Sequence, residues 1–138
     1  MKNMPETSVN DKEKEILSKL IIDEKRSVAD LEELVRLAEG TLGIEKTGQI
    51  VILNRQLNGL REQCMLGLIG ANIANKLSLR SDPDMAPQEL SSLIGKPVTT
   101  LSKPLGQLIN DGFASRIDGK YRCAFYRAKE YLQMLRKD

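Results

Sequence analysis

The chain has 138 residues, enough for one well-buried domain with an appended helical arm but too few for two full domains. With 41% hydrophobic residues, 29% charged residues and a net charge of +2, its composition is that of a globular protein, and no apolar run approaches the roughly 18 residues that a membrane span requires. It has no histidine and only two cysteines, which excludes the usual zinc ligand sets and the commonest general base, so we expect no enzyme, no metal and no cofactor.

The N-terminal third is predicted to be helical after a disordered tail. Residues 1–10 are polar, lack periodicity and contain a proline, and they have no apolar core of the kind a signal peptide needs, so we expect a disordered tail in a cytoplasmic protein. From Asp11 to about Ile22 one apolar stripe predicts a helix, formed by Ile16, Leu17, Leu20 and Ile21.

A second helical pattern follows the charged residues 23–26. Ser27 with Asp30 three residues later is a capping-box pattern, and Gly40 marks an end. The stripe between them consists of Leu31, Leu34, Val35 and Ala38. The chain therefore starts with one long helix or two, which either pack on the rest of the chain or serve as a dimerisation arm.

Residues 41–53 are predicted to be a connector followed by one strand. Residues 41–47 are rich in turn formers, whereas residues 49–53 form an apolar, β-branched run that is too short for a helix. A lone apolar strand needs a partner. We expect it either to join the edge of a later hairpin or to pair with its copy in a second subunit.

Residues 58–77 are predicted to form a central helix. Asn58 can cap it, and its residues are apolar on nearly every side, which is typical of a buried helix. Gly67 and Gly70 would let a neighbouring helix or strand come close. Cys64 in this helix and Cys123 in a later strand are interpreted as small core residues rather than as a redox pair.

A short helix is predicted over 86–95, after a loop over 80–85. Pro87 suits a first helical position, Gly95 suits the end, and the apolar residues are Leu90, Leu93 and Ile94.

A second helix is predicted over 98–111, with Gly112 as its stop. Its apolar stripe consists of Val98, Leu101, Leu105, Leu108 and Ile109, and the rest of its surface is polar and free of acid until Asp111. Pro104 removes a backbone donor within it. Either the helix is kinked at Thr100, or it begins late with Ser102 as its N-cap and residues 96–101 form a longer turn.

Residues 113–117 and 120–124 are predicted to be the two strands of a hairpin, joined by Asp118-Gly119, the pair best suited to a two-residue turn. This turn sets Arg116 opposite Tyr121 and Ser115 opposite Arg122. Residues 127–137 then form an amphipathic helix whose apolar face consists of Ala128, Tyr131, Leu132 and Leu135.

The order of these elements resembles a winged helix-turn-helix domain of the kind found in the MarR and ArsR repressor families. The resemblance lies in residues 89–95 (ELSSLIG), 105–113 (LGQLINDGF) and 116–122 (RIDGKYR), and it covers about 60 residues counting the preceding helix. Residues 47–77 are also similar to small archaeal winged-helix proteins of unassigned role. The resemblance implies a mainly α fold with a small β-wing: a helical arm plus one strand over 11–53, a winged domain over 54–126 and a C-terminal helix over 127–138.

The resemblance implies double-stranded DNA as the partner and a homodimer formed through the N-terminal and C-terminal helices. The charge distribution agrees with this reading, because residues 76–138 carry 11 basic against 7 acidic residues and residues 1–75 carry 10 against 12. We expect DNA contacts from three elements: the recognition helix over 98–111, the wing over 113–124 and the preceding helix over 86–95. The expected contact residues are Ser91, Ser92, Thr99, Thr100, Ser102, Lys103, Gln107, Arg116, Lys120 and Arg122.

This interpretation makes the chain a DNA-binding transcriptional regulator. The alternative is a winged-helix module that binds another protein without DNA. A continuous positive surface formed by Lys103, Arg116, Lys120 and Arg122 would favour DNA.

Overall fold

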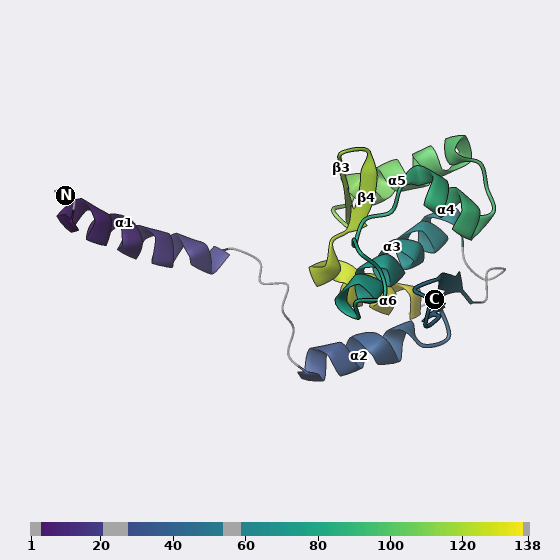
Figure 1. The fold of residues 1–138 in the computed structure, drawn as a ribbon, viewed down its shortest axis with the longest axis horizontal. Helices are drawn as coiled ribbons and strands as arrows, with labels where there is room; N and C mark the ends of the chain where they lie inside the picture. The colour runs from purple at the N-terminus through teal and green to yellow at the C-terminus, as the bar shows by residue number, and fades with distance from the viewer. Residues whose placement is uncertain (1–3, 21–27, 54–58, 137–138) are drawn as a thin grey trace.

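The computed structural model describes residues 4–20, 28–53 and 59–136. Within them the fold is mainly helical, with two small antiparallel sheets of two strands each (Figure 1). The elements are α1 Met4–Leu17, η1 Ser18–Leu20, α2 Val28–Ala38, β1 Leu42–Ile44, β2 Ile50–Ile52, α3 Leu60–Lys76, α4 Pro87–Ile94, α5 Val98–Asn110, β3 Ala114–Ile117, β4 Lys120–Cys123, η3 Phe125–Arg127 and α6 Ala128–Arg136. No helix among the described residues is both long and apolar enough to cross a membrane.

Helix α3 is the centre of the core, as its sequence predicts. Every residue from Gln63 to Asn72 is buried, and the helix contacts α4, α5 and both sheets. Its glycines permit this close packing. A Cβ at Gly67 would lie 2.8 Å from a methyl carbon of Leu93 in α4, and one at Gly70 would lie 2.7 Å from a methyl carbon of Ile50 in β2. Asn58 lies outside the described residues, and the helix takes Gly59 as its N-cap.

The sheet formed by β1 and β2 corrects the prediction for residues 41–53. The strand predicted over 49–53 exists as β2, but its partner is β1, which lies in the segment expected to be a connector, with Gly43 paired to Val51. The later hairpin, which was one of the two expected partners, forms a separate sheet with its own two strands. The partner strand was missed because it is three residues long with glycine in the middle, so it shows no apolar alternation.

The N-terminal third contains two described helices. Helix α1 begins at Met4, so the disordered tail expected over 1–10 is wrong for residues 4–10, and Pro5 is tolerated because the first turn needs no intrahelical N–H. Residues 1–3 lie outside the described residues, as do Ile21, Ile22 and the predicted cap Ser27. Figure 1 shows α1 standing apart from the rest of the molecule.

Helix α2 buries only part of the predicted stripe. Leu34 and Ala38 of that stripe are buried together with Leu37, whereas Leu31 and Val35 are exposed. Helix α6 lies against α2, and its residues Ala128, Tyr131 and Leu132 are buried. The predicted apolar face of the C-terminal helix is therefore covered by α2 of its own chain. Residues 137–138 lie outside the described part.

An ion-pair cluster reinforces the contact between these two helices. Lys129 Nζ of α6 lies 3.6 Å from Asp30 Oδ1 and 3.4 Å from Glu33 Oε1 of α2. The buried apolar contacts supply most of the stabilisation, because exposed ion pairs contribute about 1 kcal/mol or less each.

Candidate nucleic-acid interface

Helix α4 begins and ends as its sequence predicts. Pro87 occupies its first position, and the Ala86 N–H donates to Glu89 Oε1 at 2.9 Å, which caps the free backbone donor at the start. Gly95 ends the helix in the left-handed region with φ of 81°. Leu90, Leu93 and Ile94 are buried, so α4 is held firmly against α3 and α5.

Helix α5 runs without interruption from Val98 to Asn110, with Pro97 as its N-cap. The alternative in which the helix begins at Ser102 is therefore wrong, because Pro104 lies in the seventh position of the helix rather than in its first turn. Since proline has no N–H, the Thr100 carbonyl receives no backbone donor four residues later. Leu101, Leu105 and Leu108 are buried as predicted, whereas Val98 is exposed.

The outer face of α5 brings together five of the predicted DNA contacts. All five side chains are exposed: Thr99, Thr100, Ser102, Lys103 and Gln107. Lys103 has no ion pair with any described residue, and the first acidic residue on this helix is its C-cap, Asp111. The face can therefore donate hydrogen bonds and attract an anion along about two and a half turns.

The β3–β4 hairpin forms with the predicted register. Ser115 pairs with Arg122 and Arg116 pairs with Tyr121, and the turn residues Asp118 and Gly119 both have positive φ, as a type I′ turn requires. The two arginines lie on opposite faces, and the Arg116 guanidinium lies 5.3 Å from the centre of the buried Tyr121 ring.

The loop between α3 and α4 meets this hairpin through a backbone bridge. Met85 N–H donates to the Tyr121 carbonyl and Tyr121 N–H donates to the Met85 carbonyl, both at 2.8 Å. This antiparallel bridge places Asp82 and Asp84 of the loop beside the basic residues of β4. The sequence did not predict this contact, because residues 80–85 were interpreted only as a loop.

Two predicted phosphate contacts are held by these carboxylates. Lys120 Nζ lies 3.1 Å from Asp82 Oδ2, and the Arg122 guanidinium donates from Nε and Nη2 to the Asp84 carboxylate. The Asp84 backbone N–H, with the Lys120 ammonium, keeps the pKa of Asp82 below its usual value. Asp82 is therefore charged at neutral pH, and the carboxylates of Asp82 and Asp84 offset the positive charge of the hairpin.

Arg80 fixes the loop that carries the aspartates. Its guanidinium makes a bidentate pair with Glu89 of α4, at 3.0 and 2.9 Å, and its Nε donates to the Asp82 carbonyl at 2.9 Å. This pairing lowers the pKa of Glu89, mainly through the hydrogen bonds from Arg80. The loop is thus tied both to the start of α4 and to the hairpin.

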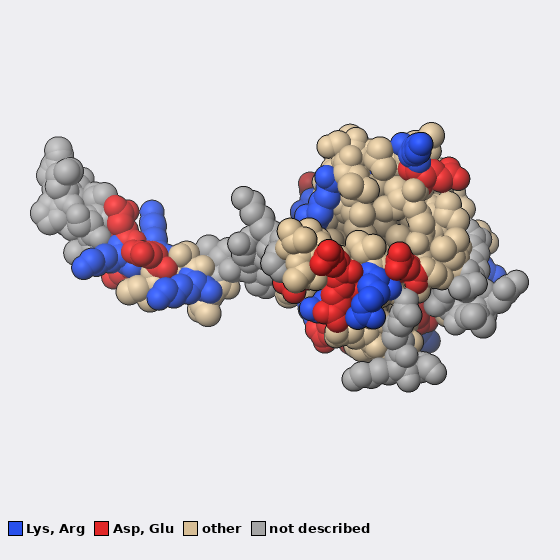
Figure 2. Space-filling view, turned by 90° about the horizontal axis from the view of Figure 1, so that it is seen from below, with Lys and Arg blue, Asp and Glu red and all other residues tan. Residues whose placement is uncertain are grey.

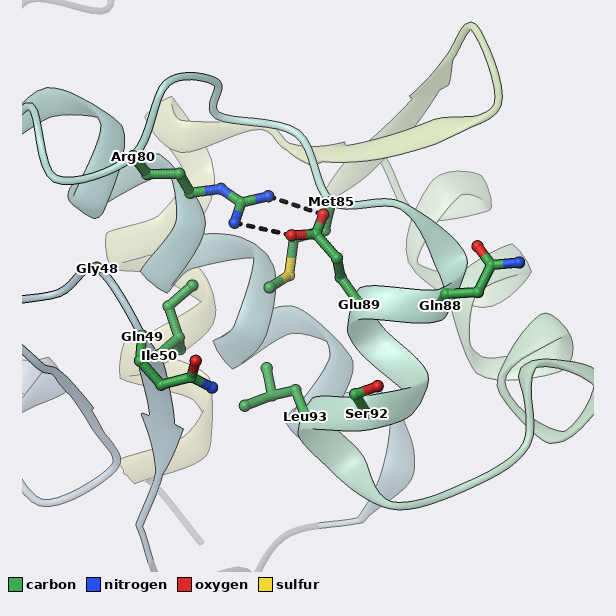
Figure 3. Close-up of a pocket in the computed structure, with 9 residues that line it drawn as sticks. All are labelled: Gly48, Gln49, Ile50, Arg80, Met85, Gln88, Glu89, Ser92 and Leu93. Carbon is green, nitrogen blue, oxygen red and sulfur yellow. Dashed lines mark hydrogen bonds and ion pairs between the residues drawn. The ribbon is translucent and has the colours of Figure 1, made fainter.

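The two predicted serine contacts on α4 differ in their surroundings. Ser91 Oγ donates to the Lys96 carbonyl at 2.7 Å and so shapes the turn into α5. Ser92 is exposed and lines a pocket of about 330 Å³ between α4 and the turn before β2, together with Gln49 and Gln88 (Figure 3). Figure 3 also shows the Arg80–Glu89 pair in the wall of this pocket. The Arg80 guanidinium donates to Glu89 and to backbone carbonyls of its own chain, so the two charged residues of the pocket are paired with each other.

The cysteines take the core positions expected from the sequence. Cys64 and Cys123 are both buried and free, and burial raises the pKa of the Cys64 thiol to about 12. A thiol with such a pKa stays protonated and unreactive at neutral pH.

The face of α5 and the hairpin therefore form a surface of neutral donors with a few basic side chains. It does not carry one continuous run of unpaired positive charge, since Lys120 and Arg122 are paired. No protein-family model, curated protein or solved structure matched the chain in comparisons with known proteins.

Proposed function

We propose that the chain is a winged helix-turn-helix DNA-binding protein that acts as a transcriptional regulator in the cytoplasm. The order α3, α4, α5, β3 and β4 supports this proposal, and so does the Met85–Tyr121 bridge, which adds a third extended segment to the hairpin. In such a domain α5 would enter the major groove and the hairpin would lie along the adjacent backbone.

The acid-free outer face of α5 is the observation that carries the proposal. Thr99, Thr100 and Ser102 are short donors suited to phosphates and base edges, and Gln107 is long enough for a bidentate contact with adenine. Lys103 supplies the local positive charge. Helix α4 would contribute Ser92 at the phosphate backbone, whereas Ser91 would act through the turn that it holds.

The hairpin would add weaker contacts. Arg116 is exposed and packs on Tyr121, so it is placed to reach a phosphate, whereas Lys120 and Arg122 must leave Asp82 and Asp84 or share them. We expect about four phosphate contacts per subunit, which gives a log-log salt slope near −4. A homodimer would set two such surfaces about one helical turn of DNA apart.

The test is binding of random-sequence duplex DNA by fluorescence anisotropy at roughly 50 and 200 mM salt. We expect micromolar binding at low salt that collapses at high salt. Lys103→Glu should weaken binding strongly, and Lys103→Glu with Lys120→Glu should abolish it. The matched control is Lys46→Glu, which makes the same charge change at an exposed residue in the turn between β1 and β2.

Absence of binding at both salt concentrations, or equal affinity in the Lys103 and Lys46 variants, would contradict the proposal. The second candidate function, a protein-interaction module, would then be favoured. The pairing of Lys120 and Arg122 with carboxylates is the observation on its side, because it removes part of the positive surface that DNA requires.

A further inference from the structure

Helix α5 contains one glycine, Gly106, that its own fold does not require. Its φ lies outside the left-handed region, and a Cβ added there would meet no atom of the described residues within 4 Å. Alanine would therefore fit, and it would stabilise the helix, because glycine in a helix interior loses more conformational freedom on folding. A glycine that its own fold does not need is typical of a place where another molecule approaches the backbone closely.

Gly106 lies on the outward face of α5, opposite the three buried leucines of this helix. It shares this face with Thr99, Lys103, Gln107 and Asn110, which follow one another at intervals of three or four residues and are all exposed. Asn110 was not among the predicted contacts, although its spacing places it on the same face. The glycine is therefore surrounded by side chains that can hydrogen-bond to a partner.

The two amides on this face, Gln107 and Asn110, are suited to adenine. A side-chain amide can donate from its N–H to N7 of adenine and accept from N6 with its carbonyl oxygen. The two residues are about 4.5 Å apart along the helix axis, which is close to the rise of about 3.4 Å between successive base pairs. Helix α5 contains no arginine, the residue that most often reads guanine.

The C-terminal end of α5 has its negative charge offset by two arginines. Arg61 Nη1 of α3 lies 3.7 Å from Asp111 Oδ2, and the Arg127 guanidinium donates from Nη1 to the Asp111 carbonyl. A helix C-terminus carries a partial negative charge that would otherwise repel DNA. The half of α5 that carries the amides can therefore approach a polyanion.

The opposite side of the body is less suited to a polyanion. Figure 1 shows α4, α5 and the β3–β4 hairpin on the side away from α2. Figure 2 views the molecule from the α2 side, and acidic and basic side chains lie next to one another on that face. Helix α5, by contrast, contains neither aspartate nor glutamate. The charge distribution therefore favours an approach to its outward face.

We propose that the C-terminal half of α5 docks on the base edges of two neighbouring A·T pairs, with Gly106 as the point of closest approach and Gln107 and Asn110 each holding one adenine. The recognition helix of a helix-turn-helix domain commonly contacts base edges with its N-terminal residues, whereas here the long amides lie in the second half. This inference rests on the proposed function, and it adds the residues and the base pairs that set the specificity.

The first test is selection of duplexes from a random-sequence pool by the full chain, followed by sequencing. We expect the wild type to enrich two neighbouring A·T pairs. Gln107→Ala and Asn110→Ala should each lose the preference at one of them and weaken binding to the selected duplex about tenfold. Neither variant should change the affinity for random DNA at low salt by more than about twofold, because neither removes a charge. Gln49→Ala, at an exposed glutamine outside α5, is the matched control.

Gly106→Ala tests the close approach, because it should change stability and affinity in opposite directions. The urea midpoint should rise with the higher helix propensity of alanine. The affinity for the selected duplex should fall about tenfold or more, since the new methyl group would stand between the helix and the base edges. Gly43→Ala is the matched control: Gly43 in β1 also has room for a Cβ, and its substitution should leave the affinity unchanged.

The outcomes separate this inference from the proposed function. A Gly106→Ala variant that binds the selected duplex as tightly as the Gly43→Ala variant would overturn the inference and leave DNA binding in place. A selected pool without neighbouring A·T pairs, or one that both amide variants reproduce, would do the same. A wild-type chain that binds no duplex at low salt would overturn the proposed function, and this inference with it.

Discussion

Asp82 and Asp84 decide how much of the hairpin's positive charge is available to a partner. Neither residue was among the predicted site residues, yet each holds one of the predicted phosphate contacts. An exposed ion pair contributes about 1 kcal/mol or less to folding, so the two pairs matter more for the surface potential than for stability.

Asp82→Asn with Asp84→Asn should therefore raise the affinity for duplex DNA, by about threefold to tenfold at low salt, because two charges that repel phosphate are removed and Lys120 and Arg122 are released. Anisotropy titrations measure this. Asp11→Asn with Glu13→Gln in α1 makes the same change in net charge away from the hairpin and should have a smaller effect. Equal gains in the two double variants would show that only net charge matters.

Substitutions at Gly40 and Gly48 distinguish the cost of a left-handed backbone from the cost of a steric clash. Both have positive φ, of 92° and 85°. A Cβ at Gly48 would lie 2.3 Å from the Leu79 carbonyl oxygen, whereas a Cβ at Gly40 would meet nothing within 4 Å. Gly40→Ala should cost about 1 kcal/mol for the left-handed backbone alone. Gly48→Ala should cost about 3 kcal/mol, because the clash with the backbone adds to this strain. Urea unfolding of both variants measures the difference, and equal losses would argue against the close approach of Gly48 to Leu79.

At the scale of elements, α4, α5 and the β3–β4 hairpin follow local signals in the chain. Pro87 and Gly95 bound α4, the spacing of Leu101, Leu105 and Leu108 gives the buried face of α5, and Asp118-Gly119 sets the hairpin register. These features were predictable because each depends on residues a few positions apart. The buried face of α2 was predicted only in part, since its apolar residues spread over two adjacent faces and packing against α6 buries Leu37 rather than Leu31 and Val35.

Helix α5 contains a backbone defect that a single substitution can repair. Pro104→Ala should stabilise the fold by about 1–3 kcal/mol, since alanine restores a donor for the Thr100 carbonyl and has a higher helix propensity. Chemical denaturation measures the change, with Gln107→Ala on the same helix as a control expected to stay within about 0.5 kcal/mol. A loss of stability in the Pro104 variant would mean that the helix is bent at the proline and packs only in that form.

At the scale of the whole molecule, the carboxylates with lowered pKa values set the response to acid. The pKa of Glu89 lies below its ordinary value of about 4.3, mainly because of Arg80, and that of Asp82 lies below about 3.9. A folded-state pKa below the unfolded one contributes stability above the unfolded value, and that contribution is lost as the pH falls through the folded value. The unfolded chain binds more protons in that range.

The free energy of unfolding should therefore be nearly constant from about pH 7 to 5 and fall below about pH 4. Glu89→Gln should lower stability at neutral pH by about 1 kcal/mol or less, since the pair with Arg80 is partly exposed, and should lose less than the wild type on acidification. Urea titrations at neutral pH and below about pH 4 measure these free energies of unfolding. They are made at one fixed protein concentration, because association would shift the apparent stability. Glu13→Gln, at an exposed residue of α1, is the control, and a pH profile identical to that of the wild type in the Glu89 variant would contradict the assignment.

The sequence by itself determined the helices α3, α4, α5 and α6, the hairpin register and the polar face of α5, because helical period, proline and glycine positions and turn chemistry are properties of neighbouring residues. Only the tertiary structure decided that β1 pairs with β2, that α6 is covered by α2, and that Asp82 and Asp84 lie against Lys120 and Arg122. The two aspartate pairs join residues 38 positions apart, and the Glu33–Lys129 pair between α2 and α6 joins residues 96 positions apart. Local patterns carry no information about such pairs, since the folding of the whole chain brings them together.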